Sequence, residues 1–411
     1  MRGLRRQHDE EQRTSFAELF FDLVFVFVVT QLSSLLVHDL TVGGAAKTLF
    51  LLLAAWWAWI YTTWVTNWFD PETLVVRAIL LVGMLASMLG AIALPDAFGD
   101  RALLFVAGYV GIQTFRNAFM VLATTRDDPL HRPFERILGW SLGVGVLWLA
   151  GAIAEGDTRV GIWLAALILD YAGPFAGHWT PGLGSSHPSE WHLEPSHFVE
   201  RLELFLIIAL GESIVAAGAT ASDLELTAGR LVALTIAFLM TVALWWLYFD
   251  FHAERTLQEL RAADAERGRL GRDLSYLHIP LIAGIIVAAV ANELVIAHPG
   301  DRLDHAELVA LAGGPVLYLL GSVAFKMRVL HGMWEQRLLA ALLVAAAVLL
   351  GASLPALALW AIVLGIVAGV ATFESTGMRR GRRMSRGSDD GRGAPGSALR
   401  ARRCGPGRRA Y

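Results

Sequence analysis

Cysteine and charged residues are scarce in this sequence of 411 residues. The one cysteine, Cys404, excludes an intrachain disulfide bond and a metal site built from several cysteines. Charged residues make up 17% of the chain, whereas soluble domains carry about 25%. The chain also lacks a phosphate-binding loop and a dinucleotide-binding glycine motif. These absences speak against a soluble nucleotide-dependent enzyme.

One apparent catalytic motif is present, but its context does not suit catalysis. Residues 139–143 read Gly-Trp-Ser-Leu-Gly, a pattern that marks a nucleophile only where a strand turns into a helix. Here the motif lies inside an apolar segment, where small residues four apart favour helix packing. Four histidines, His178, His187, His192 and His197, have spacings that do not suit a zinc site on one helix face. We therefore expect no enzyme activity, no metal and no cofactor.

Long apolar segments dominate what is present. Hydrophobic residues make up 55% of the chain, and the mean hydropathy is +0.52. About twelve segments are long enough to cross a bilayer, since a crossing helix needs about 20 apolar residues. They lie near residues 16–37, 46–68, 74–94, 102–123, 134–154, 160–178, 198–219, 229–250, 276–297, 306–325, 337–354 and 356–373. We predict an all-α fold, a polytopic membrane helix bundle in contact with the lipid bilayer.

The basic residues predict how this bundle is oriented. If the N-terminus is cytoplasmic, most of the 34 lysine and arginine residues fall on the inner side, as the positive-inside rule requires. We therefore expect both termini in the cytoplasm. The charged segment 251–275 should form a short helix on the cytoplasmic surface. The tail 374–411, rich in arginine and glycine, should be disordered and should meet anionic lipid rather than nucleic acid.

Matching residues in the two halves predict an internal repeat. Phe16 and Glu18 correspond to Phe198 and Glu200, and further matches follow in the same order. Because both halves begin on the same side of the membrane, the repeat would be parallel, with six helices in each unit. Chance similarity between apolar helices is the alternative. The expected parts are a cytoplasmic segment 1–14, a first repeat 15–178, a cytoplasmic linker 179–196, a second repeat 197–373 and the tail.

The segment from Ser15 to Val37 is apolar, yet it carries Glu18 and Asp22 one helical turn apart on one face. A carboxylate at the centre of a lipid-facing helix costs about 2.5–3.5 kcal/mol, so a polar interior should receive this pair. Glu18 also lies close enough to the helix end to cap it. Arg116, late in the fourth segment, is the expected partner of these acids. The alternative is that Arg116 reaches the lipid headgroups.

Acidic residues also lie inside two later segments. The charged residues of the seventh segment are Glu200, Arg201, Glu203 and Glu212. Glu212 lies about 22 Å along the helix axis from the start of that segment, which predicts a carboxyl group that carries a proton or a cation. A hydrogen-bonded structural carboxyl group is the alternative. Asp170 precedes Gly173 and Pro174, and a broken helix beside an acid is typical of a midplane ion site, although a structural kink would use the same residues.

The second segment carries an aromatic stripe. Trp57 and Tyr61 lie one turn apart on one face, and Asn67 and Asp70 follow near the end of the segment. Helix packing with an interfacial belt of aromatic residues is the simplest interpretation. Trp57 and Tyr61 would lie too deep for a belt alone, and they would suit the wall of a vestibule for a cation or an apolar ligand.

Four motifs together resemble a known family. They are residues 15–26 (SFAELFFDLVFV), the stretch from Trp57 to Asp70, residues 169–174 (LDYAGP) and residues 209–213 (ALGES). Their joint order is similar to that of the bacterial low temperature requirement protein A family over nearly all of residues 14–373. The resemblance implies a multi-pass inner-membrane protein associated with growth in the cold, and it implies no settled molecular activity. Potassium or proton channels with six plus six spans are more distantly similar, because they also place a Phe and an Asp early in the first span of each repeat. The second half of this chain has Leu202-Glu203-Leu204 in place of that pair.

These features favour an ion-coupled secondary transporter. Its site would lie between the two halves and would use the charged residues Glu18, Asp22, Asp170, Arg201 and Glu212. The expected ligands are a proton or cation and a small solute, and the acids should face one shared polar interior. The alternatives are an ion channel or leak, and a non-transporting membrane sensor or scaffold.

Overall fold

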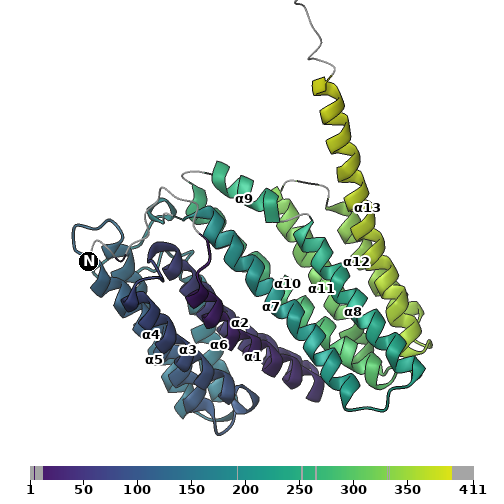
Figure 1. The fold of residues 1–411 in the computed structure, drawn as a ribbon. Coiled ribbons are helices and arrows are strands. Elements are labelled where there is room, and N and C mark those ends of the chain that lie inside the picture. The colour runs from purple at the N-terminus through teal and green to yellow at the C-terminus, as the bar shows by residue number, and fades with distance from the viewer. Residues whose placement is uncertain are drawn as a thin grey trace, which may run out of the picture.

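Two groups of long helices lie side by side in the molecule (Figure 1). The computed structural model describes residue 4 and residues 13–191, 193–250, 253–263, 266–330, 332 and 334–390. The first group consists of α1 (Phe16–His38), α2 (Val42–Trp68), α3 (Leu74–Ala93), α4 (Ala102–Ala123), α5 (His131–Ile153) and α6 (Gly156–Ala172). The second group consists of α7 (Pro195–Ser222), α8 (Ala228–Phe249), α9 (Ala253–Ala262), α10 (Arg267–Ala297), α11 (His305–Phe325), α12 (Glu335–Leu350) and α13 (Ala356–Asp390). Short helical turns are η1 (Leu94–Asp96), η2 (Pro188–Glu190) and η4 (Lys326–Leu330).

Polar residues fix where several of these helices begin. The Ser15 hydroxyl group accepts a hydrogen bond from the backbone N–H of Glu18, and the Glu18 carboxylate accepts one from the backbone N–H of Ser15. Thr41, Thr227 and Asp304 cap α2, α8 and α11 with their side-chain oxygens. Because a cap satisfies backbone donors that have no helical partner, each of these apolar segments starts at a defined residue.

Glycines allow two pairs of helices to approach each other closely. A Cβ atom on Gly108 of α4 would lie 2.6 Å from the carbonyl oxygen of Ala86 in α3. A Cβ atom on Gly314 of α11 would lie 2.5 Å from the backbone nitrogen of Ala288 in α10. No side chain fits at either glycine, so α3 packs on α4, and α10 on α11, with their backbones nearly in contact.

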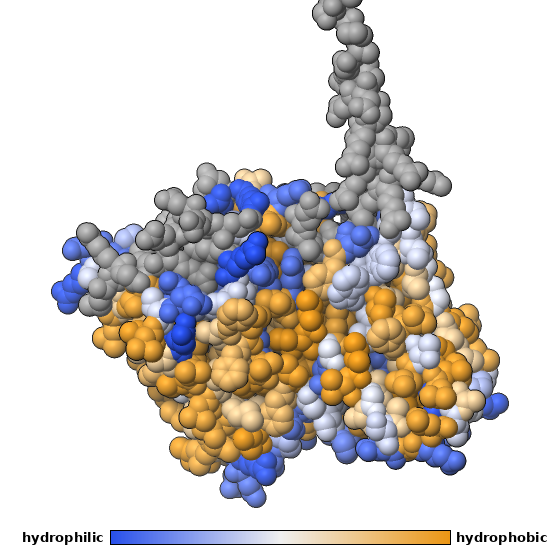
Figure 2. Space-filling view, viewed as in Figure 1, coloured by the Kyte–Doolittle hydropathy of each residue, from blue (hydrophilic) through white to orange (hydrophobic). Residues whose placement is uncertain are grey.

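The outer surface of the helices is apolar, as a lipid-facing surface would be. Figure 2 shows a hydrophobic band across the middle of the visible face, with hydrophilic residues gathered at both ends of the helices. Within the described residues, nine helices are long and apolar enough to cross a membrane. They are α1, α2, α3 with η1, α5, α7, α8, α10, α11 with η4, and α13 up to Thr376. The expected count of about twelve crossings is therefore not confirmed.

The helix boundaries agree closely with the apolar segments of the sequence, with three exceptions. Helix α6 ends at Ala172 rather than near residue 178. Helix α10 begins at Arg267 rather than near residue 276, so the charged segment 251–275 contains α9 and the first turns of α10. Helix α13 continues to Asp390, and Glu374 is buried. The boundary expected at residue 373 thus falls inside a helix, because Glu374 pairs with cations of neighbouring helices. Residues 391–411 of the expected tail lie outside the described residues, as do residues 1–3 and 5–12 of the expected N-terminal segment.

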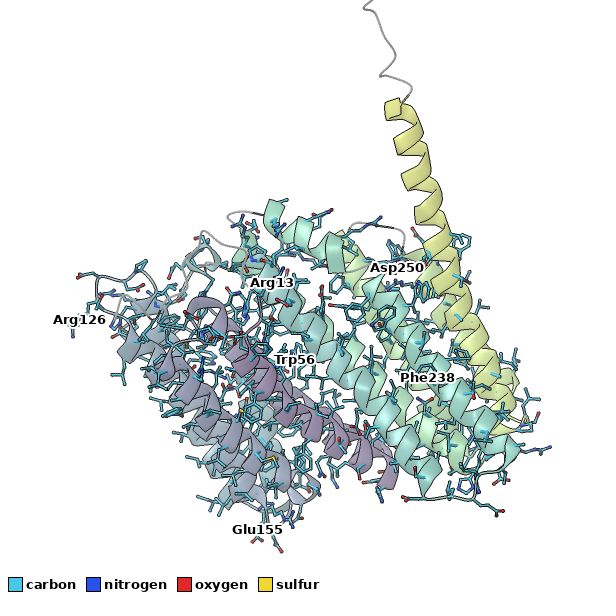
Figure 3. All side chains as sticks on the ribbon, viewed as in Figure 1. Arg13, Trp56, Arg126, Glu155, Phe238 and Asp250 are labelled. Atoms are coloured by element: carbon cyan, nitrogen blue, oxygen red, sulfur yellow. The ribbon has the colours of Figure 1, made fainter. Side chains whose placement is uncertain are left out.

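Four helices meet where the two groups join. Helices α1 and α2 of the first group contact α7 and α10 of the second. Trp56 of α2, labelled in Figure 3, packs edge-on against Phe205 of α7 at 5.2 Å between ring centres. The Trp56 indole N–H also donates to the carbonyl oxygen of Ser275 in α10 at 2.8 Å. This junction positions most of the polar residues considered next.

Candidate functional site at the junction of the helix groups

Helices α1 and α7 lie side by side and run in the same direction. Three side-chain pairs link them in order, namely Glu18 with His197, Asp22 with Arg201, and Thr30 with Glu212. The partners are separated by 179, 179 and 182 residues, so the two helices keep a nearly constant register. Polar pairs therefore line the junction over several helical turns.

Asp22 and Arg201 form the centre of the first cluster. The Arg201 guanidinium donates from Nη1 and Nη2 to the two carboxylate oxygens of Asp22 at 2.5 and 2.7 Å. The indole N–H of Trp59 in α2 adds a third hydrogen bond to Asp22 at 2.8 Å. Arg201 is fully buried, and Asp22 is 2% exposed. The two-pronged ion pair with its additional donor compensates for the removal of both charges from water.

Glu18 extends this cluster toward the start of α1. Its Oε1 lies 2.6 Å from Nε2 of His197, and its Oε2 accepts hydrogen bonds from Ser15. The Asn67 side-chain amide lies 3.1 Å from the other His197 ring nitrogen, and it exchanges hydrogen bonds with the backbone of Glu194. Because the Asn67 amide donates to Nδ1, the ring hydrogen lies on Nε2 and points to Glu18. Asn67 therefore orients His197.

The prediction that Arg116 pairs with Glu18 and Asp22 is wrong. Arg116 donates to the carbonyl oxygen of Ala58 at 3.0 Å and to the hydroxyl group of Thr62 at 3.1 Å, both on α2. Arg201 takes its place because α7, rather than α4, packs beside the first turns of α1. In the part of the chain that the structure describes, Arg116 is buried and forms no ion pair with a carboxylate.

Asp170 belongs to a separate cluster inside the first helix group. Its Oδ2 accepts a hydrogen bond from the Tyr109 hydroxyl group of α4 at 2.8 Å and another from the Trp148 indole of α5 at 2.9 Å. Gln113 bonds both Tyr109 and Arg116, and so connects Asp170 indirectly to the buried guanidinium. The donors to this carboxyl group are thus neutral, and the group lies away from the junction between α1 and α7.

The expected broken helix around Asp170 is also wrong. Helix α6 ends at Ala172, so Asp170 lies in its last turn and Pro174 lies in the following loop. The backbone N–H of Gly173 still bonds to the carbonyl oxygens of Leu169 and Asp170. Pro174 therefore ends a helix at this point instead of interrupting one at mid-membrane.

Glu212 forms a third group further along α7. It is 2% exposed, and its Oε2 accepts a hydrogen bond from the Thr30 hydroxyl group at 2.6 Å. Glu293 of α10 is close enough to interact with it electrostatically. Across the described ranges, no basic side chain forms an ion pair with Glu212. A buried carboxyl group with such neighbours is stable when it is protonated or when a cation binds beside it.

A pocket lies between α2, α10 and the loop that follows α6. The cavity has a volume of about 70 Å³. The aromatic residues that line it are Trp57, Tyr61, Trp64, Trp68, Trp191 and Tyr276. Arg269 and Arg272 of α10 are its charged lining residues, and His178 contributes an imidazole ring. We call this site the aromatic pocket. It contains Trp57 and Tyr61, for which the sequence left packing and a vestibule as alternatives.

The other candidate residues have local roles. Glu200 accepts a hydrogen bond from the backbone N–H of Thr14 at 2.8 Å, and Asp70 accepts one from the backbone N–H of Glu72 in the turn after α2. Glu203 is partly buried on α7. Asp22, Asp170 and Glu212 therefore occupy three clusters rather than one shared interior. Each nevertheless points into protein, because none is more than 6% exposed.

The structure also pairs three charged residues that sequence analysis did not single out. Glu374 of α13 accepts hydrogen bonds from Arg337 of α12 at 2.8 and 3.1 Å and from Lys326 at 2.7 Å. All three are buried. Their positions at the ends of apolar segments could have indicated a buried ion pair in the sequence. Charged side chains at such positions, however, more often reach the lipid headgroups. Among the described residues, no group of three or more histidine, cysteine or acidic residues is placed to hold a metal ion.

Comparison with known proteins agrees with this architecture. Residues 13–372 match a family described as bacterial low temperature requirement A protein (LtrA). An uncharacterized protein of Rhizobium meliloti (strain 1021) is 38% identical over 325 residues, which cover 79% of each chain. No solved structure matches this chain. With its apolar helices, the chain is a multi-pass membrane protein, and it belongs to the bacterial low temperature requirement A protein family.

Proposed function

We propose that the protein is an ion-coupled secondary transporter of the bacterial inner membrane, and that Glu212 carries the coupling proton or cation. Twelve helices, α1–α8 and α10–α13, would cross the membrane, with both chain termini in the cytoplasm. The observation that carries this proposal is the position of Glu212. It is a buried carboxyl group at the junction of the helix groups, and a hydroxyl group, that of Thr30, bonds it.

Glu212 differs from Asp22 in what balances its charge. Asp22 is held by two hydrogen bonds from the Arg201 guanidinium, so its neutralising charge is fixed in the fold. The Thr30 hydroxyl group brings no charge, and Glu293 brings one of the same sign. A proton or a cation with affinity for oxygen ligands has to supply the balance, which suits a group that binds and releases a transported ion.

The arrangement of the helices supports a parallel repeat of six helices in each half. Helix α1 packs against α2 and α3 in the way that α7 packs against α8 and α10. The contacts between α1 and α7 are also reciprocal. Glu18 of α1 bonds His197 of α7, while Glu200 of α7 bonds the backbone of Thr14 beside α1. Two similar units that meet along a central polar seam are suited to alternating access, in which one unit rocks against the other.

The test measures ion flux in proteoliposomes that contain the purified full chain. A potassium gradient with valinomycin sets the membrane potential, a trapped pH-sensitive dye reports proton movement, and a radioactive sodium tracer reports sodium movement. The variant Glu212→Gln keeps the shape of the side chain and removes its charge. Glu225→Gln is the matched control, because Glu225 is exposed in the loop after α7. We expect flux in the wild type and in the control, and at least a tenfold loss in Glu212→Gln.

Three results would contradict parts of this proposal. Unchanged flux in Glu212→Gln would refute the role of Glu212. A current that does not saturate with ion concentration would identify a channel or leak. Absence of proton and sodium flux in the wild type under both gradients would refute transport of these ions and favour a membrane sensor or scaffold.

A further inference from the structure

The aromatic pocket has walls and a rim of different chemistry. Its interior is formed by aromatic rings, among which Trp57 stacks on Tyr171 at 4.2 Å and packs edge-on against Tyr276 at 5.8 Å between ring centres. Its charged lining residues are the two arginines Arg269 and Arg272, and no acidic side chain of the described part of the chain lines it. Flat apolar groups bind well between aromatic faces, and arginine is the side chain best suited to carboxylate and phosphate groups.

The charges around the rim leave a positive excess. Arg269 pairs with Glu266 at 3.0 Å. Arg272 and Arg328 both pair with Asp273, at 3.0 and 2.5 Å. Among the described residues, three arginines therefore meet two acids, and both acids lie outside the lining of the pocket. An anion at the rim would complete this charge balance, whereas a cation would add to the excess.

His178 adds a strained residue and an imidazole ring to the wall of the pocket. Its backbone has a φ of 51°, which makes it the one non-glycine residue with positive φ among the residues described. The ring is buried, Nε2 lies 2.7 Å from the Tyr61 hydroxyl group, and Nδ1 has no hydrogen-bond partner. A left-handed conformation at a residue other than glycine costs free energy, and such residues cluster at binding sites.

We propose that the aromatic pocket binds an organic anion with a flat or extended apolar body, whose carboxylate or phosphate group lies against Arg269 and Arg272. The apolar body lies between Trp57, Trp64 and Tyr276. The pocket lies beside the Glu18–Asp22–Arg201 cluster, yet shares no residue with it. Binding at this pocket is independent of the transport proposed above, because it requires no ion movement and no contribution from Glu212.

The test uses the full-length protein in nanodiscs of phosphatidylcholine, which has no net charge. The probe is 2-naphthoate, a flat aromatic carboxylate, and binding is measured by isothermal titration calorimetry. The amine 2-naphthylmethylamine has a similar body and the opposite charge. The double variant Arg269→Gln, Arg272→Gln removes both charged lining residues. Arg328→Gln is the matched control, because Arg328 belongs to the same charge cluster and does not line the pocket.

We expect saturable binding of 2-naphthoate at one site per chain and at least tenfold weaker binding of the amine. The double variant should weaken 2-naphthoate binding by about tenfold or more, since it removes both guanidinium groups that would bond the carboxylate. Arg328→Gln should change it by less than about threefold. Arg269 is 45% exposed, so Arg269→Gln alone provides a variant whose fold is undisturbed.

A second set of nanodiscs, containing phosphatidylglycerol, distinguishes two sources of the same ligand chemistry. If this anionic lipid weakens 2-naphthoate binding at least tenfold in competition, the natural occupant is a lipid. If the affinity is unchanged, the occupant is a soluble organic acid. Equal binding of the acid and the amine would overturn the proposal. Full affinity of a folded double variant would overturn it as well.

Discussion

The Arg201–Asp22 pair predicts opposite outcomes for single and double replacement. In Arg201→Met, the Asp22 and Glu18 carboxylates stay buried next to each other and lose their guanidinium partner. Trp59 and His197 remain as donors, but they bring no permanent charge. Removing one partner of a buried ion pair costs about 3–5 kcal/mol, because an unbalanced charge is left in a place without water. We expect a loss of this size in the free energy of unfolding.

The double variant Asp22→Asn, Arg201→Met should recover much of that loss. The amide introduced at position 22 keeps an oxygen acceptor for the Trp59 indole, and it carries no charge that needs a partner. Replacing both members of a buried ion pair with neutral side chains is often close to neutral for stability. We expect the double variant to lie within about 1–2 kcal/mol of the wild type, which gives a coupling free energy of about 2 kcal/mol or more between the two positions.

The assay is equilibrium unfolding of the purified protein in mixed micelles, with increasing mole fraction of sodium dodecyl sulfate and circular dichroism as the readout. A complete double-mutant cycle requires both single variants, the double variant and the wild type. The reasoning would be refuted if Arg201→Met cost less than about 1 kcal/mol, or if the two single costs simply added in the double variant.

Three further predictions concern stability at other positions. Ser15→Ala should lower the free energy of unfolding by about 1 kcal/mol in the same assay, because α1 loses its capping hydroxyl group; an unchanged value would contradict the capping role. Glu374→Gln should cost about 3–5 kcal/mol, since Arg337 and Lys326 lose the carboxylate that balances their charges in the protein interior; a cost below about 1 kcal/mol would show that water reaches them. Burial lowers the pKa of His178 from 6.5 to about 3. As the pH drops below about 6.5, the unfolded chain therefore binds a proton at this histidine before the folded chain does. The free energy of unfolding falls in this range by up to about 1.4 kcal/mol per pH unit. His178→Asn should flatten this part of a thermal-stability curve against pH, and an unchanged slope would assign the pH dependence to other groups.

Helix positions could be predicted from this sequence because lipid imposes a simple rule on it. A segment that crosses a membrane must be apolar along most of its length and must satisfy its own backbone hydrogen bonds, so the hydropathy of the sequence marks it directly. The predicted helix boundaries were wrong where ion pairs, rather than hydropathy, decide how far the packed part of a helix extends. Glu374 extends the packed part of α13 because cations on α12 and η4 face it, and these partners are distant in sequence.

The partners of the buried acids were much harder to predict. Depth in a helix shows that a carboxyl group is costly and must face protein, and Asp22, Asp170 and Glu212 all do so. Which side chain faces it depends on the neighbouring helix and on the register between the two. The sequence favoured Arg116 as the partner of Asp22, whereas the packing of α7 on α1 selects Arg201.

The nature of the partner separates the three acids more clearly than their depth does. Asp22 faces a guanidinium group, so its charge is balanced whatever the surroundings contain, and it holds α1 to α7. Asp170 faces a phenol and an indole, which orient it without balancing a charge. Glu212 faces a hydroxyl group across the same α1–α7 junction as Asp22. One junction thus contains a fixed ion pair near its beginning and, further along, a buried carboxyl group that has no ion-pair partner among the described residues. If Glu212 takes up an ion as proposed, the junction would stay closed at the level of the ion pair while the two units rock against each other at the level of Glu212.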